Sequence, residues 1–290
     1  MWFYAAVSTA FISGIATILS KHTLKKIDPI IFYWIVLVVS TPFILILVWK
    51  DGIPSIDQLF TVGILGSVIF YTISKIIFFQ TIKNAELSNI YPLVSIGPIF
   101  TLIFSMIILS EQPSAMELLG GGITLLGTYV LNISSMREGI FEPFKILFRN
   151  KLALLMLISV FIGSIVMVFD KLAINHTFPQ NTSFALLIEN LVIVFGFLPW
   201  IMLRKKNVFS EILDSKKLIL ALGVLGAAGN VLAFWALGGG DPGIVSSIFR
   251  TQVFFVLLFS YLFLKDRPKL ETIIGSIIMI LGLIVLKLAS

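Results

Sequence analysis

Long apolar runs, separated by short polar connectors, constrain this chain more than any other feature. Each run is about 20 residues long, the length that an α-helix needs to cross the hydrocarbon core of a bilayer. Charged residues make up only 12% of the chain, against a usual share of about 25%, and the mean hydropathy is +1.05. Only helices and closed barrels satisfy the backbone in lipid, and unbroken apolar runs are not typical of barrel strands. The sequence therefore predicts an all-α integral membrane protein.

Ten such runs are expected to be transmembrane helices. The predicted spans are 2–20, 30–49, 59–79, 88–110, 117–134, 152–170, 183–203, 217–237, 243–264 and 270–289. The connectors carry helix-breaking residues, such as Asp28-Pro29 and Asp241-Pro242-Gly243. The chain has no cysteine, which excludes disulfides, thiol nucleophiles and Cys-ligated metals. We also expect no nucleic-acid partner, because the net charge of +6 lies in the connectors and not on a groove-reading face.

The sequence repeats itself. Residues 104–131 resemble residues 259–286 at a constant offset of 155, with ten of 28 positions identical. The least common identities are Pro113/Pro268, Gly120/Gly275 and Gly127/Gly282, and Glu111/Asp266 keeps an acid before the proline. A second match at an offset of 150 pairs Lys21 with Lys171. An internal duplication of this kind predicts a first five-helix unit over 1–135, a connector over 136–151 and a second five-helix unit over 152–290.

Because each unit has an odd number of spans, the two units must cross the membrane in opposite directions. The connectors that follow odd-numbered spans, counted with Lys217 at the start of the eighth span, hold 16 Lys and Arg residues, and the other connectors with the C-terminal Lys287 hold 3. The positive-inside rule then places both termini outside the cytoplasm. Two inverted five-helix repeats are the architecture of many secondary transporters, which bind substrate near the midplane where the repeats meet.

A loose motif of prolines, an acid and glycines runs through both halves. It is carried by Pro92, Pro98, Phe100, Glu111, Pro113, Gly120 and Gly127, and in the second half by Phe255, Asp266, Pro268, Gly275 and Gly282. The motif resembles the repeat of the EamA branch of the drug/metabolite transporter (DMT) superfamily, and the resemblance covers the whole chain. It implies a ten-helix inverted-repeat carrier, commonly an exporter of amino acids or other metabolites.

Two features depart from what the resemblance implies. Members of the family usually have cytoplasmic termini, whereas the charge bias here predicts the reverse orientation. The small multidrug resistance relatives carry a proton-binding Glu in their first helix, and Ser13 and Gly163 stand near that position here. Their Glu-based exchange of protons and drugs is therefore not carried over.

Three ionisable residues lie within predicted spans, where a charge is costly and is a functional candidate by default. Glu189 and Arg250 fall at nearly the same depth of parallel spans, so they can form a substrate clamp or a permanent ion pair. Lys75 lies roughly 14 Å away along the membrane normal. It can bind an anion or extend its long side chain to the nearer interface. Asp170 is expected at the end of its span, in the interface.

Polar residues at repeat-equivalent positions predict a central cavity among spans 3, 4, 8 and 9. The candidate lining residues are Tyr71, Asn89, Tyr91, Asn230, Trp235, Ser246, Ser247, Thr251 and Gln252. The alternative role of these residues is hydrogen bonding between helices. Pro92 and Pro98, beside Gly97, are expected to kink span 4, either as a gate or as a static bend.

Together these features favour a secondary active transporter in the cell membrane that exports a small polar metabolite, such as an amino acid or an organic anion, by alternating access. A channel and a lipid flippase or scramblase remain as alternatives. An intramembrane lipid-modifying enzyme is a further one, although His22 and His176 both lie at span ends and no acid–base cluster is evident. The expected partners are the solute, the bilayer and a proton or counter-substrate, and no cofactor or metal is expected. A monomer and a homodimer are both compatible with the sequence.

Overall fold

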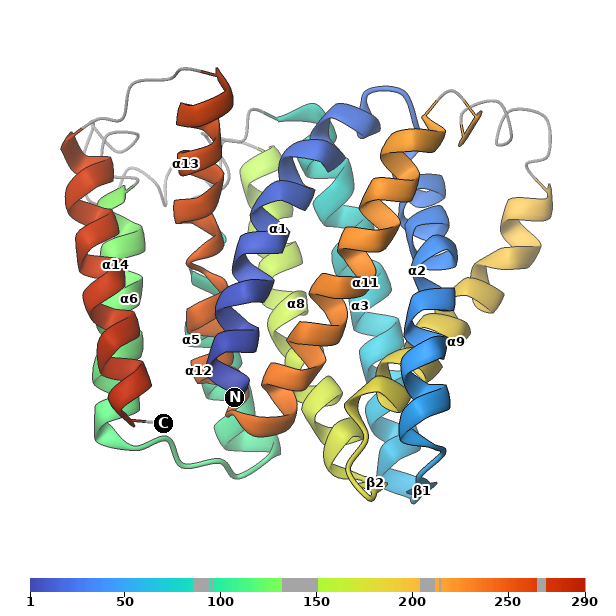
Figure 1. Cartoon of the computed structure of the whole chain (residues 1–290), viewed down its shortest axis with the longest axis horizontal. Coiled ribbons are helices and arrows are strands. Elements are labelled where there is room, and N and C mark those ends of the chain that lie inside the picture. Colours follow the sequence, from blue (N-terminus) through green and yellow to red (C-terminus); the bar gives the residue numbers. More distant parts are fainter. Residues whose placement is uncertain are drawn as a thin grey trace.

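A computed structural model describes residues 1–85, 94, 96–131, 151–203, 212–213, 215–264 and 270–289 as a bundle of helices with one small pair of strands (Figure 1). The helices of the first half are α1 (Trp2–Leu24), α2 (Pro29–Asp51), α3 (Gln58–Asn84), α5 (Gly97–Ile108) and α6 (Ala115–Leu131). Those of the second half are α8 (Lys151–Asn175), α9 (Thr182–Leu203), α11 (Lys216–Gly239), α12 (Pro242–Phe249), α13 (Gln252–Leu264) and α14 (Leu270–Ala289). The strands are β1 (Ser55–Ile56) and β2 (Thr177–Phe178).

Acidic residues in the connectors start two of these helices. The Asp28 side chain accepts a hydrogen bond of 2.9 Å from the Ile30 amide, and Pro29 occupies the first turn of α2. Asp57 does the same for α3, accepting from the amides of Leu59 and Phe60. An N-terminal carboxylate satisfies amides that have no partner within the helix, and proline is tolerated there because its missing N–H is not needed. The connectors thus fix where these apolar segments begin.

Six of the described helices, α1, α2, α3, α8, α9 and α11, are long and apolar enough to cross a membrane. The helix α5 and the apolar parts of α6 and α14 (Ala115–Gly127 and Ile274–Ala289) are shorter in the described residues. Many large apolar side chains on the bundle exterior are exposed, for example Trp49 and Leu203, each at 87%. A soluble protein rarely exposes so much apolar surface. The chain is therefore an all-α, multi-pass membrane protein.

The structure corrects two sequence-based expectations about the helices. The expected single helix over 243–264 is broken, because α12 ends at Phe249 and α13 begins at Gln252. Pro98 does not kink the interior of a helix, since α5 begins at Gly97 and Pro98 lies in its first turn. Proline is compatible with that position. The other proline of this expected kink, Pro92, lies outside the described residues.

Glycines let α6 and α14 pack against each other along one edge of the bundle (Figure 1). A Cβ atom added at Gly120 would lie 2.9 Å from the Leu286 amide nitrogen. One added at Gly127 would lie 2.5 Å from the Met279 nitrogen. Small residues at such crossings allow backbones to approach closely. These glycines therefore serve the packing of α6 against α14.

The remaining helices of the two halves interleave. α1 packs along α11, α3 along α8 and α2 along α9, so that each of these helices has a neighbour from the other half. Both termini and the β1–β2 pair lie at the same end of the bundle (Figure 1). We call this the termini end. The antiparallel pairing of β1 with β2 joins the α2–α3 connector of the first half to the α8–α9 connector of the second.

Candidate functional site

A cavity of about 350 Å³ lies between the interleaved helices. Its walls come from α1, α2, α3, α8, α9, α11 and the junction of α12 with α13, with Val94 contributing from the segment before α5. The sequence predicted walls from spans 3, 4, 8 and 9, which correspond to α3, the segment that contains α5, α11, and the α12–α13 pair. It did not predict the contributions of α1, α2, α8 and α9. Both halves of the chain contribute to the cavity, which has the size and enclosure of a small-molecule site.

Most of the predicted site residues that the structure describes line this cavity. They are Tyr71, Lys75, Glu189, Asn230, Arg250 and Gln252. Trp235 does not line it, because its side chain is 49% exposed on α11. Ser246, Ser247 and Thr251 are buried, and their hydroxyls bind to neighbouring groups outside the cavity. Asn89, Tyr91 and Pro92 lie outside the described residues.

The break between α12 and α13 places Arg250 at the cavity. The amides of Arg250 and Thr251 bond back to the carbonyls of Ser246 and Ile248, at 3.2 and 3.0 Å. The Thr251 hydroxyl also donates to the Ile248 carbonyl, at 2.7 Å. Threonine side chains compete in this way with the helical hydrogen-bond pattern. Irregular backbone at membrane depth is tolerated where protein surrounds it or where it lines a cavity. Discontinuous helices form the substrate sites of many transporters.

Gly97 makes room for the Arg250 guanidinium. A Cβ atom added at Gly97 would lie 2.7 Å from Arg250 Nη2 and 3.2 Å from a Val160 methyl carbon. Any larger residue would therefore displace the guanidinium. The Gly97 carbonyl is itself held by the Ser164 hydroxyl, at 3.0 Å. Gly97 thus leaves the space that the guanidinium occupies. Its expected part beside Pro92 and Pro98, as a gate or a static bend, stays a prediction.

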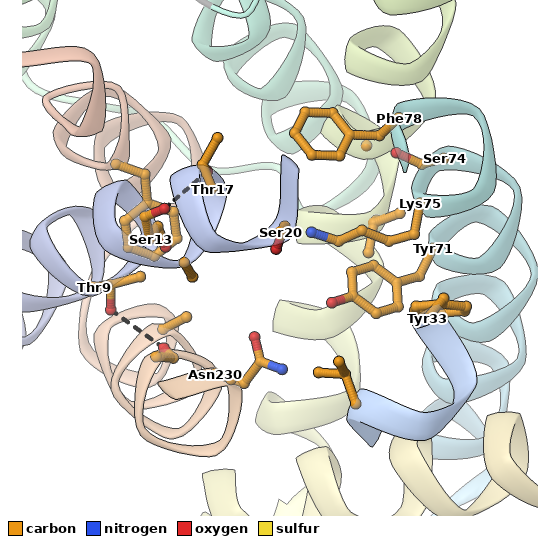
Figure 2. Close-up of a pocket in the computed structure, with 18 of the residues that line it drawn as sticks. Thr9, Ser13, Thr17, Ser20, Tyr33, Tyr71, Ser74, Lys75, Phe78 and Asn230 are labelled. Atoms are coloured by element: carbon orange, nitrogen blue, oxygen red, sulfur yellow. Dashed lines mark hydrogen bonds between the residues drawn. The ribbon is translucent and has the colours of Figure 1, made fainter. Parts of the chain in front are cut away.

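Lys75 extends into the cavity toward α1 and does not run to the membrane interface (Figure 2). Its ammonium nitrogen lies 5.2 Å from the centroid of the Tyr71 ring and 5.7 Å from that of Phe78. A cation over aromatic faces is stabilised electrostatically. Among the described residues the ammonium has no hydrogen-bond acceptor and no carboxylate within 4 Å. It therefore presents an available positive charge to any solute in the cavity.

Glu189 and Asp170 face each other across a serine hydroxyl. Ser67 Oγ lies 2.9 Å from Glu189 Oε1 and is also hydrogen-bonded to Asp170 Oδ1. Both carboxyl groups are buried and line the cavity. A hydroxyl carries one proton, so it can donate to one of these oxygens only. A proton on either carboxyl group would satisfy the other contact.

This arrangement differs from the sequence expectation in two respects. Glu189 is hydrogen-bonded to Ser67, and the Arg250 guanidinium lies in the space beside Gly97. Asp170 was expected in the interface, yet it is 7% exposed, because α8 continues to Asn175 and carries Asp170 inside the bundle. Neither Ser67 nor Asp170 was predicted as a site residue. The signal that could have identified Ser67 is its position as a polar residue in the middle of a predicted span.

Hydrogen bonds also order the α1 wall of the cavity. Gln252 Nε2 donates to the Thr17 hydroxyl at 2.8 Å and to the Ser13 carbonyl at 3.1 Å. These bonds tie the start of α13 to the middle of α1. Ser13 and Gly163, the positions near which small multidrug resistance relatives carry a proton-binding Glu, both line the cavity.

The fold and the cavity define the class of this chain as a multi-pass membrane protein built around a solute-sized polar site. Comparison with known proteins supplies the family. The model of the EamA-like transporter family matches residues 1–133 and 150–288, and the chain belongs to that family. The family assignment predicted from the sequence motif is confirmed.

Three curated relatives have been matched over parts of the chain. An uncharacterized transporter of Synechocystis sp. is 30% identical over 127 residues, covering 41% of this chain and 37% of the relative. A second uncharacterized transporter of that organism is 28% identical over 149 residues, covering 44% and 38%. An uncharacterized protein of Methanocaldococcus jannaschii is 26% identical over 125 residues, covering 42% and 89%. The match thus spans less than two fifths of either Synechocystis protein.

A solved crystal structure shares the fold. It superposes with a TM-score of 0.69 at 14% sequence identity, and the match covers 99% of this chain and 95% of the other. At that identity the likeness concerns the fold alone. Together with the family match, it identifies the chain as a member of the EamA-like transporter family that has the fold of this crystal structure.

Proposed function

We propose that this protein is a secondary active transporter that exports a small polar metabolite carrying an anionic group. The observation that carries the proposal is the cavity, in which Lys75 and Arg250 lie between helices of both halves. An ionisable side chain within a membrane span is costly and usually marks a solute pathway. The cavity volume of about 350 Å³ is suited to a metabolite of the size of an amino acid or an organic acid.

The charges of the cavity favour an anion. In this proposal Lys75 and Arg250 contribute two cations, and Glu189 and Asp170 share one proton and contribute one net negative charge. One positive charge is left for the solute to neutralise. In this arrangement Arg250 holds a carboxylate or phosphate oxygen, because its guanidinium suits bidentate recognition. Lys75 adds a second donor, and Glu189 is placed to accept a substrate amine or a coupling proton.

We further propose that the architecture is a ten-helix inverted repeat. Two hydrogen bonds made by equivalent lysines support it. Lys21 donates to the Ala85 carbonyl at 2.9 Å, and Lys171 donates to the Gly240 carbonyl at 3.2 Å. The two lysine donors are 150 residues apart in the sequence, and the two carbonyl acceptors are 155 residues apart. These are the two offsets of the sequence repeat. The Methanocaldococcus relative, of which a 125-residue match covers 89%, also has about the size of one half.

An inverted repeat provides two related conformations that open the same cavity to opposite sides. Alternating access by exchange between them is therefore the proposed mechanism. The charge bias of the connectors places the termini end outside the cytoplasm, and the cell membrane is the proposed location. A proton bound by Glu189 and Asp170 would supply the coupling, and the carrier acts as a monomer or a homodimer.

Counterflow in liposomes tests this function. Purified protein is reconstituted with an unlabelled organic anion or amino acid inside, and uptake of the labelled solute is measured. A carrier gives saturable uptake that the internal solute stimulates. Arg250→Ala should abolish it, whereas Lys50→Ala, which removes an exposed lysine at the termini end, should not.

Other outcomes identify the alternatives. Flux that does not saturate and is not stimulated from the opposite side would indicate a channel. Movement of labelled lipid without solute uptake would indicate a scramblase, and recovery of a chemically altered substrate would indicate an enzyme. Each of these results would overturn the proposed carrier.

A further inference from the structure

Charged groups of both halves meet at the termini end of the cavity, outside the site described above. Glu111 lies in the connector between α5 and α6, in the first half. Asp241 lies between α11 and α12, and Lys171 lies near the end of α8, both in the second half. Asp170, next to Lys171, and Leu237, whose carbonyl Lys171 binds, line the cavity. The three charged groups therefore lie between the cavity and the surface at the termini end.

Lys171 is fixed by its own half. Its ammonium donates to the Leu237 carbonyl at 2.7 Å and to the Gly240 carbonyl at 3.2 Å, at the C-terminal end of α11. A helix C-terminus carries partial negative charge, which favours a cation there. The side chain is only 9% exposed. Lys171 is thus a positive charge fixed by the second half, and Glu111 of the first half lies close enough to be influenced by it.

Glu111 is held in an environment that suits its neutral form. Its Oε2 is buried and has no hydrogen-bond partner among the described residues. Burial, followed by the Asp241 carboxylate, raises the pKa of Glu111 to about 7, against the opposing effects of the Lys171 ammonium and the Ser105 hydroxyl. Burial and then the Glu117 carboxylate likewise raise the pKa of Asp241, which Lys171 lowers. Bringing the halves together here therefore favours proton uptake by Glu111.

The sequence repeat keeps the same types of charge at the equivalent positions of the other half. The positions equivalent to Lys171, Asp241 and Glu111 are Lys21, Glu86 and Asp266. All three thus keep their sign of charge in both halves, although few polar identities survive elsewhere in the repeat. Glu86 and Asp266 lie outside the described residues, so this correspondence is one of sequence.

We propose that Glu111, Lys171 and Asp241 form a gate at the termini end of the cavity, closed when Glu111 binds a proton. The inference rests on the proposed alternating-access function. In the closed gate Glu111 is half-buried against the second half, and opening returns its carboxyl group to water. Opening therefore releases the proton toward the termini end, and closing takes one up.

The direction of the pH effect follows from the raised pKa. Glu111 has a pKa of about 7 in the closed gate and its ordinary value of 4.5 when it is solvated. The closed gate is therefore favoured below the ordinary pKa and loses this advantage as the pH rises toward 7. Because Glu111 remains partly exposed, we expect a shift of about tenfold in the closed-to-open ratio between about pH 5 and about pH 8.

Because the chain has no cysteine, spin labels can be attached at cysteines introduced at chosen positions. Spin labels are attached to cysteines introduced at Ala115 and Gln180, one in each half at the termini end. Ala115 is exposed at the start of α6, and Gln180 is exposed just before α9. Distances between the labels are measured by pulsed electron paramagnetic resonance in nanodiscs. The wild-type background should show a short distance at about pH 5 and a growing longer component toward about pH 8.

Three variants separate the gate from a merely structural contact. Glu111→Gln mimics the protonated acid and should keep the short distance at both pH values. Asp241→Asn removes the acid that opposes ionisation of Glu111, so the midpoint of the transition should move to lower pH. Asp51→Asn, an exposed acid at the same end, should titrate like the wild type.

A distance that does not change with pH in the wild-type background would overturn the gate. So would a Glu111→Gln variant that titrates like its parent. The counterflow assay on the same samples keeps the two hypotheses apart. Saturable counterflow without a pH-dependent distance rejects the gate alone, whereas a pH-dependent distance without counterflow in any variant rejects the proposed function.

Discussion

Gly97→Ala should weaken substrate binding without unfolding the protein. The new methyl carbon would lie 2.7 Å from Arg250 Nη2, and carbon in ordinary contact needs about 3.5 Å or more. The guanidinium must therefore move by about 1 Å. Because the clashing atom is the end of a flexible side chain, we expect a loss of stability of only about 1 kcal/mol.

The effect on binding should be larger. A hydrogen bond to a charged group is worth about 1.5 to 3 kcal/mol, and each 1.4 kcal/mol is about a tenfold change in affinity. Loss of one such bond between Arg250 and the solute predicts a Kd about 10- to 100-fold higher. Counterflow at varied solute concentration should show the change in KM, with the maximal rate less affected.

Gly196→Ala provides the matched control. Gly196 lies within α9, and a Cβ atom there would meet no atom within 4 Å. This variant should keep the affinity of the wild type. If Gly97→Ala and Gly196→Ala bind the solute equally well, the contact between Gly97 and Arg250 does not position the substrate, and the reasoning is refuted.

Three further predictions concern the cavity and the packing of the helices. Lys75→Met should keep the fold and lower the affinity for anions by about tenfold, because one charged contact is lost. A binding titration measures this affinity, and an unchanged value would show that Lys75 is not part of the site. Glu189→Gln should abolish accumulation driven by a pH gradient but leave counterflow, and accumulation that persists would reject proton coupling through Glu189. Gly127→Val should lower the thermal midpoint, since its Cβ would lie 2.5 Å from the Met279 nitrogen and force α6 from α14 at a cost of about 1 to 3 kcal/mol. Gly122→Val, where no atom lies within 4 Å, should be much milder, and equal midpoints would contradict the packing argument.

Apolar length and loop charge were enough to predict the membrane location and most helix positions. The described ends differ from prediction by a few residues, as for α1, which continues from the expected Ser20 to Leu24. Lys21 lies inside this helix, and its ammonium donates to the Ala85 carbonyl. A hydropathy pattern does not contain that contact, which depends on a distant part of the chain.

The details of the site were less predictable, because helices that are apolar all round give no periodic signal of their inner face. Trp235 was expected in the cavity, yet it is half exposed, while Asn230 on the same helix lines the cavity. The break at Arg250 arises from hydroxyl and amide contacts with carbonyls of the preceding turn. The pairing of Ser67 with Asp170 joins α3 to α8, and a sequence alone does not reveal which residues meet across two helices.

The central claim is that the cavity binds an anionic solute through Lys75 and Arg250. The most direct test is the thermal stability of the purified protein, measured against matched sets of organic anions, amino acids, nucleosides and organic cations. We expect an anion or an amino acid to stabilise the wild type with a saturable dependence on concentration, and Arg250→Ala to lose this stabilisation. Stabilisation by cations alone, or an equal response of the Arg250→Ala variant, would contradict it.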